Sequence, residues 1–460
     1  MSKRRFIHTG RNKTKKTTTS FYKKTPKLIK VNNIYLLLLP IKASNATQME
    51  CSIFGGNFIE TKKNGGVSHL LEHILINSSK YCGIQKCSSY LDNYGIEYNA
   101  STHSMFTNYW LKGLPEYNEI MLNYITSTIF YPKITQELVT KEKEAVRHEL
   151  KSFMNSPSWK LSDLMYKSFY REPGLKNDMD YKLQLNLLDK IGMRELKQHI
   201  EEIITKRCIL FTISGNFNKN KVVNHFKEIT FPLQHKKCAL QNVNLSKQCY
   251  TFANKIIFVR HKEAENTNIS IAFPIDIKQG DKYGIYLGFL SSILGGDLNS
   301  ILLKRLREEL NLVYGLKVTT DTDLCGSSLF ITTSTRDKDV KKVIYEIFLL
   351  IHFYINNPIP YDKINNEKLK YKLMLNQLCI TNPEVVSDFY THQYFWQLNK
   401  KIRKIWTLRD ISKNIENVSL STIKALMKKT FNTNNCIIGY IGTTNVNLSF
   451  GGIHKYIAKK

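Results

Sequence analysis

The sequence lacks an apolar run of the length that a membrane-spanning helix needs, about twenty residues. Its stretch "IYLLLLPI", 34–41, has only the length of a strand. It also lacks a Cys-x-x-Cys pair, because its nine cysteines are spread from Cys51 to Cys436. The closest two, Cys82 and Cys87, are poor evidence for a zinc site without a second pair. We therefore expect reduced, mostly buried thiols, as in an intracellular protein.

Acidic residues are scarce relative to basic ones, and the formal net charge is +29. Such a charge invites a nucleic-acid or anionic-membrane partner. The lysines, however, are scattered along the chain among many Asn and Ile residues, whereas a binding patch would concentrate them. A basic nucleic-acid-binding protein therefore remains a rival hypothesis, and it depends chiefly on the first thirty residues.

Residues 1–30 contain eleven Lys or Arg and no acid, which predicts an extended, solvated tail. This segment lacks the apolar core of a secretory signal and the apolar helical face of a mitochondrial transit peptide. We expect an intracellular, cytoplasmic location, with mitochondrial targeting by residues 1–30 as the less favoured alternative.

At 460 residues the chain is too long for one typical core, and its pattern of strands and helices repeats once. In the first half, strands are predicted at 33–43, 47–60, 98–110 and 208–217, and helices at 65–79, 115–130 and 135–154. In the second half, strands are predicted at 268–275, 312–322, 327–335 and 436–442, and helices at 280–294 and 301–310.

These patterns divide the chain into five segments. They are a basic tail (1–30), an N-terminal domain (31–232), a linker without periodicity (233–250), a C-terminal domain (251–447) and a second tail (448–460). The two domains resemble each other in pattern and have little sequence identity.

The stretch "GGVSHLLEHILINSS", 65–79, places two histidines and a glutamate within five residues. On a helix, His69 and His73 lie on one face a turn apart, so two imidazoles can point at one metal ion. Glu72 lies close enough to that face to reach a water at the metal. This is the H-x-x-E-H order of inverted zinc motifs, and about 0.02 such pentamers are expected here by chance. A core histidine explains one His on an apolar helix, but two at this spacing only poorly.

A catalytic zinc generally takes three protein ligands and keeps one position for water. The helix predicted at 135–154 contains Glu142, Glu144 and Glu149. Glu142 and Glu149 are two turns apart and share a face, whereas Glu144 points away. From periodicity alone, a solvated acidic face explains these residues equally well.

"HLLEH" followed by "EKEAVRHE" resembles the pitrilysin, insulinase and mitochondrial processing peptidase family of zinc proteases. The resemblance implies that His69, His73 and Glu149 bind one Zn²⁺ per chain. It also implies that Glu72 is the general base and Glu142 an auxiliary acid. The implied fold is α+β, with two similar domains that each contain a mostly antiparallel sheet packed with α-helices.

Further segments extend this resemblance from about residue 30 to 445. "YNASTHSMFTNYW" resembles the family's edge strand beside the zinc, which makes Asn99, Ala100 and Ser101 candidate substrate-binding residues. "ILGGDLNSILLKRLREELNLVYGL" resembles a segment with an Arg and a Tyr that contact substrate, here Arg307 and Tyr314. Two departures are Leu70, where the family usually has Phe, and "NSS", 77–79, which replaces Lys-Gly-Thr.

Together these features predict a zinc metalloendopeptidase that cleaves extended peptides or unfolded segments, with Glu72 as the base. Tyr314 would donate a hydrogen bond to the oxyanion. We expect a homodimer, in which Arg307 and Tyr314 of one subunit complete the other's site, or a heterodimer with a related half-length chain. The rival within the family is a non-catalytic, peptide-binding subunit of a heterodimeric processing peptidase.

Overall fold

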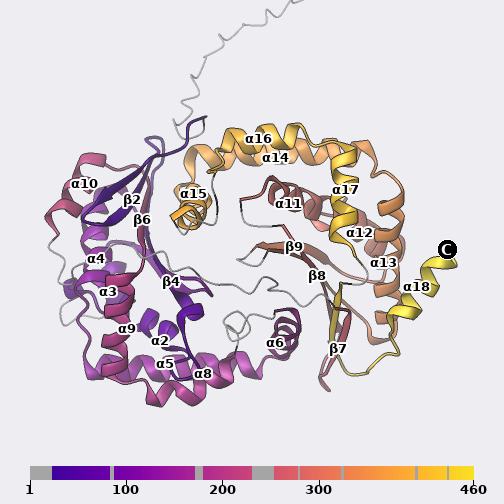
Figure 1. The fold of residues 1–460 in the computed structure, drawn as a ribbon, viewed down its shortest axis with the longest axis horizontal. Helices are drawn as coiled ribbons and strands as arrows, with labels where there is room; N and C mark the ends of the chain where they lie inside the picture. Colours follow the sequence, from indigo (N-terminus) through magenta and orange to yellow (C-terminus); the bar gives the residue numbers. More distant parts are fainter. Residues whose placement is uncertain are drawn as a thin grey trace, which may run out of the picture.

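The computed structural model describes residues 23–82, 87–170, 180–229, 253–277, 280–322, 326–398, 402, 404–432 and 435–460. Most of the predicted basic tail (1–30) and all of the predicted linker (233–250) lie outside these residues. Two halves lie side by side, each built around one sheet (Figure 1). The α+β fold with two similar domains is confirmed.

The N-terminal half contains one sheet, and its own helices pack on one face of that sheet. Its strands are β1 (Leu28–Val31), β2 (Ile34–Pro40), β3 (Thr47–Phe54), β4 (Glu97–Thr102), β5 (Phe106–Gly113) and β6 (Ile209–Gly215). Its helices are α2 (Val67–Ile76), α3 (Cys87–Asp92), α4 (Asn118–Phe130), α5 (Gln136–Asn155), α6 (Pro157–Phe169), α8 (Tyr181–Leu187), α9 (Met193–Lys206) and α10 (Lys219–Glu228).

The C-terminal half repeats this plan. Its strands are β7 (Lys255–Arg260), β8 (Thr267–Ile275), β9 (Leu316–Thr322), β10 (Ser327–Thr335) and β11 (Ile437–Gly442). Its helices are α11 (Lys282–Gly295), α12 (Ile301–Leu303), the π-helical η6 (Lys304–Glu309), α13 (Val340–Asn356), α14 (Tyr361–Thr381), α15 (Pro383–Leu398), α16 (Leu408–Glu416), α17 (Leu420–Thr430) and α18 (Phe450–Ala458).

The two sheets share a five-stranded topology, to which the first sheet adds β1 at its edge. The first has the order β1-β2-β6-β3-β5-β4 and the second the order β7-β11-β8-β10-β9. In each, one pair is parallel, β2 with β6 and β7 with β11, and the remaining pairs are antiparallel. Strand β4 is therefore an edge strand, and β9 is its counterpart in the second half.

The two halves exchange one helix each. Helix α6 of the N-terminal half packs on β7 and β11 of the second sheet, and α15 of the C-terminal half packs on β3 and β6 of the first (Figure 1). The contact of α6 is apolar, with Leu161 and Met165 buried against Ile257 and Ile437. Each sheet therefore obtains part of its hydrophobic cover from the other half, which joins the two cores.

Several predicted elements differ from the structure. The strand predicted at 98–110 is a hairpin, β4 and β5, because a tight turn closes where His103 N–H donates to Phe106 O (2.8 Å). The strand predicted at 312–322 begins only at Leu316, since Leu312 N–H still bonds to Leu306 O at the end of η6 (2.8 Å). Strands β1 and β7 were not predicted from the sequence.

Residues 448–460, which we expected to form a C-terminal tail, include helix α18. This helix packs against α13, and its Ile453 is fully buried. Ser449 caps it by accepting a hydrogen bond from Gly452 N–H (3.0 Å). In the sequence, the signal for this helix is a serine at the N-cap position, Ser449, followed four residues later by the apolar Ile453.

The expectation of reduced thiols throughout is also wrong. Cys82 and Cys87 form a disulfide across 4.8 Å between their Cα atoms, within the usual range for such bonds. Cys208 is disulfide-bonded as well. Cys51 and Cys436 are buried free thiols, as expected. The sequence separation of 5 between Cys82 and Cys87 permits such a bond but does not by itself specify it.

No helix in the described part of the chain is both long and apolar enough to cross a membrane.

Candidate metal centre

Helix α2 is fixed at its N-terminus by a carboxylate. Glu60 accepts hydrogen bonds from the backbone N–H groups of Gly66 and Ser68, each at 2.7 Å. These N–H groups would otherwise lack partners in the first turn of the helix. The negative charge also interacts favourably with the helix dipole. Glu60 therefore sets the start of the helix immediately before His69.

The opposite face of α2 determines which side chains remain accessible. Its buried residues are Val67, Ser68, Leu70, Leu71, Ile74 and Leu75. The less buried face carries His69, Glu72 and His73, whose side chains project from α2 beside α5. Burial of the apolar face thus fixes the rotation of the helix and directs both imidazoles to the same side.

Helix α5 brings a carboxylate to these imidazoles. The Oε2 atom of Glu149 lies 3.5 Å from Nε2 of His69 and 3.2 Å from Nε2 of His73. The two rings are 5.1 Å apart and nearly perpendicular, at 74°. The three ligand atoms lie within 4.8 Å of one another. Among the described residues, this is the one group of His, Cys, Asp or Glu side chains that converges in this way.

Glu142 contacts His73 at Nδ1, the ring nitrogen that does not face Glu149. Its Oε2 atom lies 3.5 Å from Nδ1 of His73, and its side chain is only 6% exposed, compared with 36% for Glu149. Asn77 donates through Nδ2 to Glu142 Oε1 (3.4 Å) and to the carbonyl of His73 (3.1 Å). A carboxylate on Nδ1 fixes the ring and leaves Nε2 free for a metal.

Charges within this cluster favour a cation at its centre. Burial opposes protonation of His73, but hydrogen bonds to Glu142 and Glu149 and the charge of Glu72 outweigh it and raise the pKa to about 9. Hydrogen bonds from His69 and His73 lower the pKa of Glu149 strongly. Burial would raise the pKa of Glu142, yet the bond from His73 and the charge of Lys141 lower it overall. Both carboxylates thus stay ionised and stabilise positive charge between the helices.

The donor set fits zinc. Two imidazole nitrogens and one carboxylate oxygen are the ligands of several catalytic zinc sites, where a fourth position is left for water. In this chain His69 and His73 direct Nε2 at a single oxygen of Glu149, so the donors already face one point.

Edge strand β4 lies beside the metal cluster. Helix α2 packs against β4, and Thr102 Oγ1 donates to the carbonyl of Ser68 (3.5 Å). Asn99 and Ser101 are engaged locally, with Ala100 N–H donating to Asn99 Oδ1 (2.8 Å) and Ser101 Oγ 3.0 Å from His103 Nε2. Within the described residues, β4 pairs only with β5. Its other edge can therefore accept a further strand.

The structure does not bring Arg307 and Tyr314 to the metal cluster of the same chain. Arg307 lies in η6, directly after α12, and α2 and α12 lie on opposite sides of the molecule (Figure 1). The guanidinium of Arg307 stacks on the ring of Tyr314, with 5.0 Å between its carbon and the ring centroid. Tyr314 is 84% exposed. The ring of Tyr314 is thus accessible to another molecule.

Two supporting residues were not identified from the sequence. One is Asn77, which lies in the "NSS" segment that departs from the family pattern, at the C-cap of α2. An Asn directly after a helix is a common cap, and this position could have revealed it. The other is His199 on α9, whose Nε2 lies 3.2 Å from Ser68 Oγ. Burial lowers the pKa of His199 to about 4, so it packs as a neutral ring against α2.

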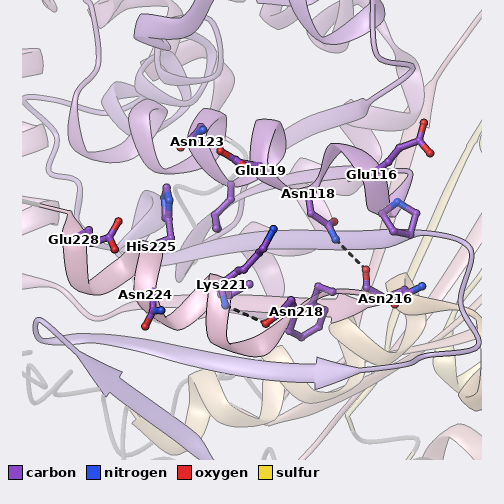
Figure 2. A pocket seen from close by; sticks show the side chains of 14 residues that line it. Glu116, Asn118, Glu119, Asn123, Asn216, Asn218, Lys221, Asn224, His225 and Glu228 are labelled. Atoms are coloured by element: carbon purple, nitrogen blue, oxygen red, sulfur yellow. Dashed lines mark hydrogen bonds between the residues drawn. The ribbon is translucent and has the colours of Figure 1, made fainter.

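A cavity of about 600 Å³ lies elsewhere, between α4 and α10. Figure 2 shows its polar lining, including Glu119, Lys221 and His225, and the bond from Asn118 Nδ2 to the carbonyl of Asn216 (2.9 Å). None of the residues that line it belongs to the metal cluster. Cavity size is therefore a poor guide to the chemistry of this protein.

The chain is similar to known proteins both in sequence and in fold. The sequence model of the insulinase family, peptidase family M16, matches residues 41–181, and that of the peptidase M16 inactive domain matches residues 190–371. Over 264 residues the chain is 23% identical to YmxG of Bacillus subtilis, named an uncharacterized zinc protease. That alignment covers 57% of this chain and 61% of the relative.

Two other comparisons extend this result. Over 174 residues the chain is 22% identical to the beta subunit of the mitochondrial-processing peptidase of Dictyostelium discoideum, covering 38% of this chain and 37% of that subunit. The crystal structure of a protease from Helicobacter pylori covers 90% of this chain and 99% of its own, with a TM-score of 0.76 at 14% identity, which shows a shared fold. Since the two sequence models together match most of the chain, it belongs to the insulinase family, peptidase family M16.

Proposed function

We propose that this protein is a zinc-dependent endopeptidase that hydrolyses extended peptides or unfolded segments. The observation that carries the proposal is the convergence of His69 Nε2 and His73 Nε2 on Glu149 Oε2, at 3.5 and 3.2 Å. A non-catalytic, peptide-binding subunit does not need this complete donor set. The geometry therefore favours the peptidase over that hypothesis.

The residues around the cluster have separate tasks in this mechanism. Zinc, when bound, supplies a Lewis acid that polarises the peptide carbonyl and makes water acidic enough to attack near neutral pH. Glu72, half-buried on the same face of α2, removes a proton from the attacking water and returns it to the leaving amine. Glu142 holds the ring of His73, and Glu149 supplies negative charge from the second helix.

Substrate would add as a strand to the open edge of β4. The backbone of Asn99, Ala100 and Ser101 then pairs with the peptide, next to α2 and its histidines. Backbone pairing is insensitive to side chains but requires an extended chain. Folded proteins present few such segments, so peptides and unfolded regions are the substrates that this edge favours.

Completion of the site by a second molecule explains the position of Arg307 and Tyr314. Both lie in the half opposite to α2, and the exposed Tyr314 has its hydroxyl available to a neighbour. In a homodimer, this pair of one subunit would reach the oxyanion in the site of the other. A related half-length chain could fill the same place in a heterodimer.

Glu72→Gln tests the catalytic role. This change keeps the size of the side chain and removes the base, and such bases typically contribute about 10²–10⁴-fold in rate. We expect one zinc per chain by metal analysis and almost no cleavage of a peptide library followed by mass spectrometry. Glu144→Gln, an exposed residue paired with Arg147, is the control and retains activity. Wild-type protein that holds no zinc and cleaves no peptide, alone or with a partner chain, would refute the proposal.

Mixing two inactive variants tests the homodimer. Glu72→Gln and Arg307→Ala subunits each lack one component of the site, but a mixed dimer contains one site with both components intact. We therefore expect part of the activity to return on mixing. No recovery, although the variants exchange subunits, would argue against completion of the site by a second copy.

A further inference from the structure

A buried carboxylate lies where the C-terminal half covers the N-terminal sheet. Glu50, on the central strand β3, is 2% exposed and lies under α15. Much of the surrounding contact is apolar, with Leu37, Leu39, Tyr390 and Phe395 among the residues buried there. An ionised carboxylate in such a place is costly unless a cation or several donors compensate it.

Hydroxyl groups from α15 hold this carboxylate. Its Oε2 atom accepts hydrogen bonds from Ser387 Oγ (2.8 Å) and Thr391 Oγ1 (3.3 Å), which lie one turn apart on α15. Thr391 also bonds to Thr212 Oγ1 on β6 (2.7 Å). Ser387, Thr391 and Thr212 are at most 1% exposed. The contact between the halves therefore has a polar centre enclosed by apolar side chains.

The hydrogens available at the other oxygen favour a protonated carboxyl group. Ser52 Oγ lies 3.3 Å from Glu50 Oε1 and 3.2 Å from Asn108 Oδ1. One hydroxyl hydrogen cannot serve both acceptors. A proton on Oε1 removes this competition, because Glu50 then donates to Ser52 and Ser52 donates to Asn108.

The charged groups that face this contact do not neutralise Glu50. On α15, Asp388 adds negative charge, and burial lowers the pKa of His392, which favours its neutral form. At the far end of α15, Glu384 is paired with Lys112 of β5, and Lys112 also contacts Glu97. Strand β6 contributes the neutral Thr212. Within the described residues, the groups that bond to Glu50 are thus the hydroxyls of Ser52, Ser387 and Thr391 and the side chain of Asn108, all of them uncharged.

We propose that Glu50, with Ser387 and Thr391, is a proton-dependent latch that holds α15 of the C-terminal half on the N-terminal sheet. Protonated Glu50 fits the buried contact, and the ionised form weakens it. Burial and the charge of Asp388, opposed by the hydroxyl donors, raise the pKa of Glu50 from 4.5 to about 7 in the docked state. The latch is therefore tightest below about pH 4.5, weakens as the pH rises, and reaches its weakest state above about pH 7.

The latch also connects to the edge strand. Phe106, at the start of β5, packs on Phe395 and His392 of α15, with ring centroids 5.1 and 5.6 Å apart. Strand β5 pairs along its length with β4. Loosening of α15 therefore removes support from the hairpin whose outer strand is β4. This inference concerns the contact between the halves and does not depend on peptidase activity.

Hydrogen exchange of α15 amides in the full-length protein between pH 5 and 8 tests the latch, after correction for intrinsic exchange. In wild type we expect protection of residues 383–398 to fall by up to about tenfold per pH unit up to pH 7 and then to level off. Glu50→Gln keeps the shape without the titration, so its protection should not change with pH. The matched control is Glu346→Gln, which removes a buried carboxylate paired with Arg305 in the C-terminal half and should leave the behaviour of α15 unchanged.

Ser387→Ala keeps the test decisive if Glu50→Gln does not fold. Loss of this hydroxyl removes a donor that favours the ionised carboxylate, so the levelling-off should move to higher pH. Corrected protection of α15 that is independent of pH in wild type would overturn the latch. Retention of the wild-type dependence in Glu50→Gln, or an unmoved transition in Ser387→Ala, would overturn it as well.

Discussion

The two halves share a sheet topology, yet among the residues that the structure describes only the N-terminal half has a His and Glu cluster that could hold a metal ion. In the N-terminal half, α2 follows β3 along the chain and carries His69, Glu72 and His73; in the C-terminal half, α11 follows the corresponding strand β8. Helix α11 contains no His, Cys, Asp or Glu between Lys282 and Gly295, and much of it is buried and apolar. The same position in the fold thus serves as a ligand platform in one half and as core in the other.

The helices that pack against α2 and α11 show the same contrast in more detail: α5 packs against α2, and α14 packs against α11. Glu142 is the seventh residue of α5 and Glu367 the seventh of α14, and both are 4% exposed. Glu142 bonds to His73, whereas Glu367 pairs with Lys370 (3.3 Å). The fourteenth residue is the candidate ligand Glu149 in α5 and Met374 in α14. A buried acid is thus compatible with both halves, and the half-buried Glu149 distinguishes the metal centre.

The largest effect is expected from His73→Ala. This change removes one of three ligands, so zinc content should fall from one per chain to near zero, and peptidase activity should be lost with it. Glu367→Gln changes the corresponding helix pair of the other half and should leave zinc content unchanged. Metal analysis and a peptide cleavage assay measure both outcomes. Equal loss of zinc in the two variants would show that the C-terminal half also contributes to zinc binding.

The sequence predicted the cluster but not the contact between the halves, for a physical reason. His69, Glu72 and His73 are close in sequence, so helical geometry alone places them together, and the family resemblance then supplied Glu149. Glu50 is separated from Ser387 and from Thr391 by more than 330 residues. Neither periodicity nor a motif links a glutamate in an apolar strand to two hydroxyls on a distant helix. The exchange of α6 and α15 depends on tertiary packing and could not be predicted.

The next largest effect concerns the contact of α15, the first of the two exchanged helices. The pKa of Glu50 is raised, so the unfolded chain loses this proton at lower pH than the folded protein does. Stability should therefore fall between about pH 4.5 and 7, by up to roughly 3 kcal/mol. Glu50→Gln should lack this contribution when urea unfolding is measured across that range. An identical pH profile in both proteins would assign the dependence to other groups.

The contact of α6 provides the apolar counterpart. A Cβ atom at Gly439 would lie 2.6 Å from Met165 Sδ and 2.8 Å from Leu161 Cδ1, so Gly439→Ala must displace α6 side chains. Such overpacking typically costs about 1–3 kcal/mol. Because this contact is largely apolar, we expect the loss in urea unfolding to be the same at pH 5 and pH 8. A loss that varies with pH would show that the two exchanged helices are held by similar forces.

A smaller effect separates Glu142 from the ligands. Glu142→Gln keeps the side-chain shape but weakens the hold on His73 Nδ1, and loss of such a supporting partner typically costs about 10–100-fold in metal affinity. Competition with a zinc chelator measures the change. Glu144→Gln, on the exposed face of the same helix, should bind zinc as wild type does. Complete loss of zinc in Glu142→Gln would instead identify this residue as a ligand.

The smallest effect is expected at the N-termini of α2 and α11, where the halves are alike. Glu60 accepts from Gly66 and Ser68 N–H, and Asp281 accepts from Tyr283 N–H (3.0 Å). Loss of a capping side chain costs about 0.5–2 kcal/mol, so Glu60→Ala and Asp281→Ala should reduce the free energy of unfolding by similar amounts. Only Glu60→Ala should also weaken zinc binding, because it frees the turn that precedes His69. Equal zinc affinity in both variants would mean that the packing of α2 on α5, and not its cap, sets the position of the histidines.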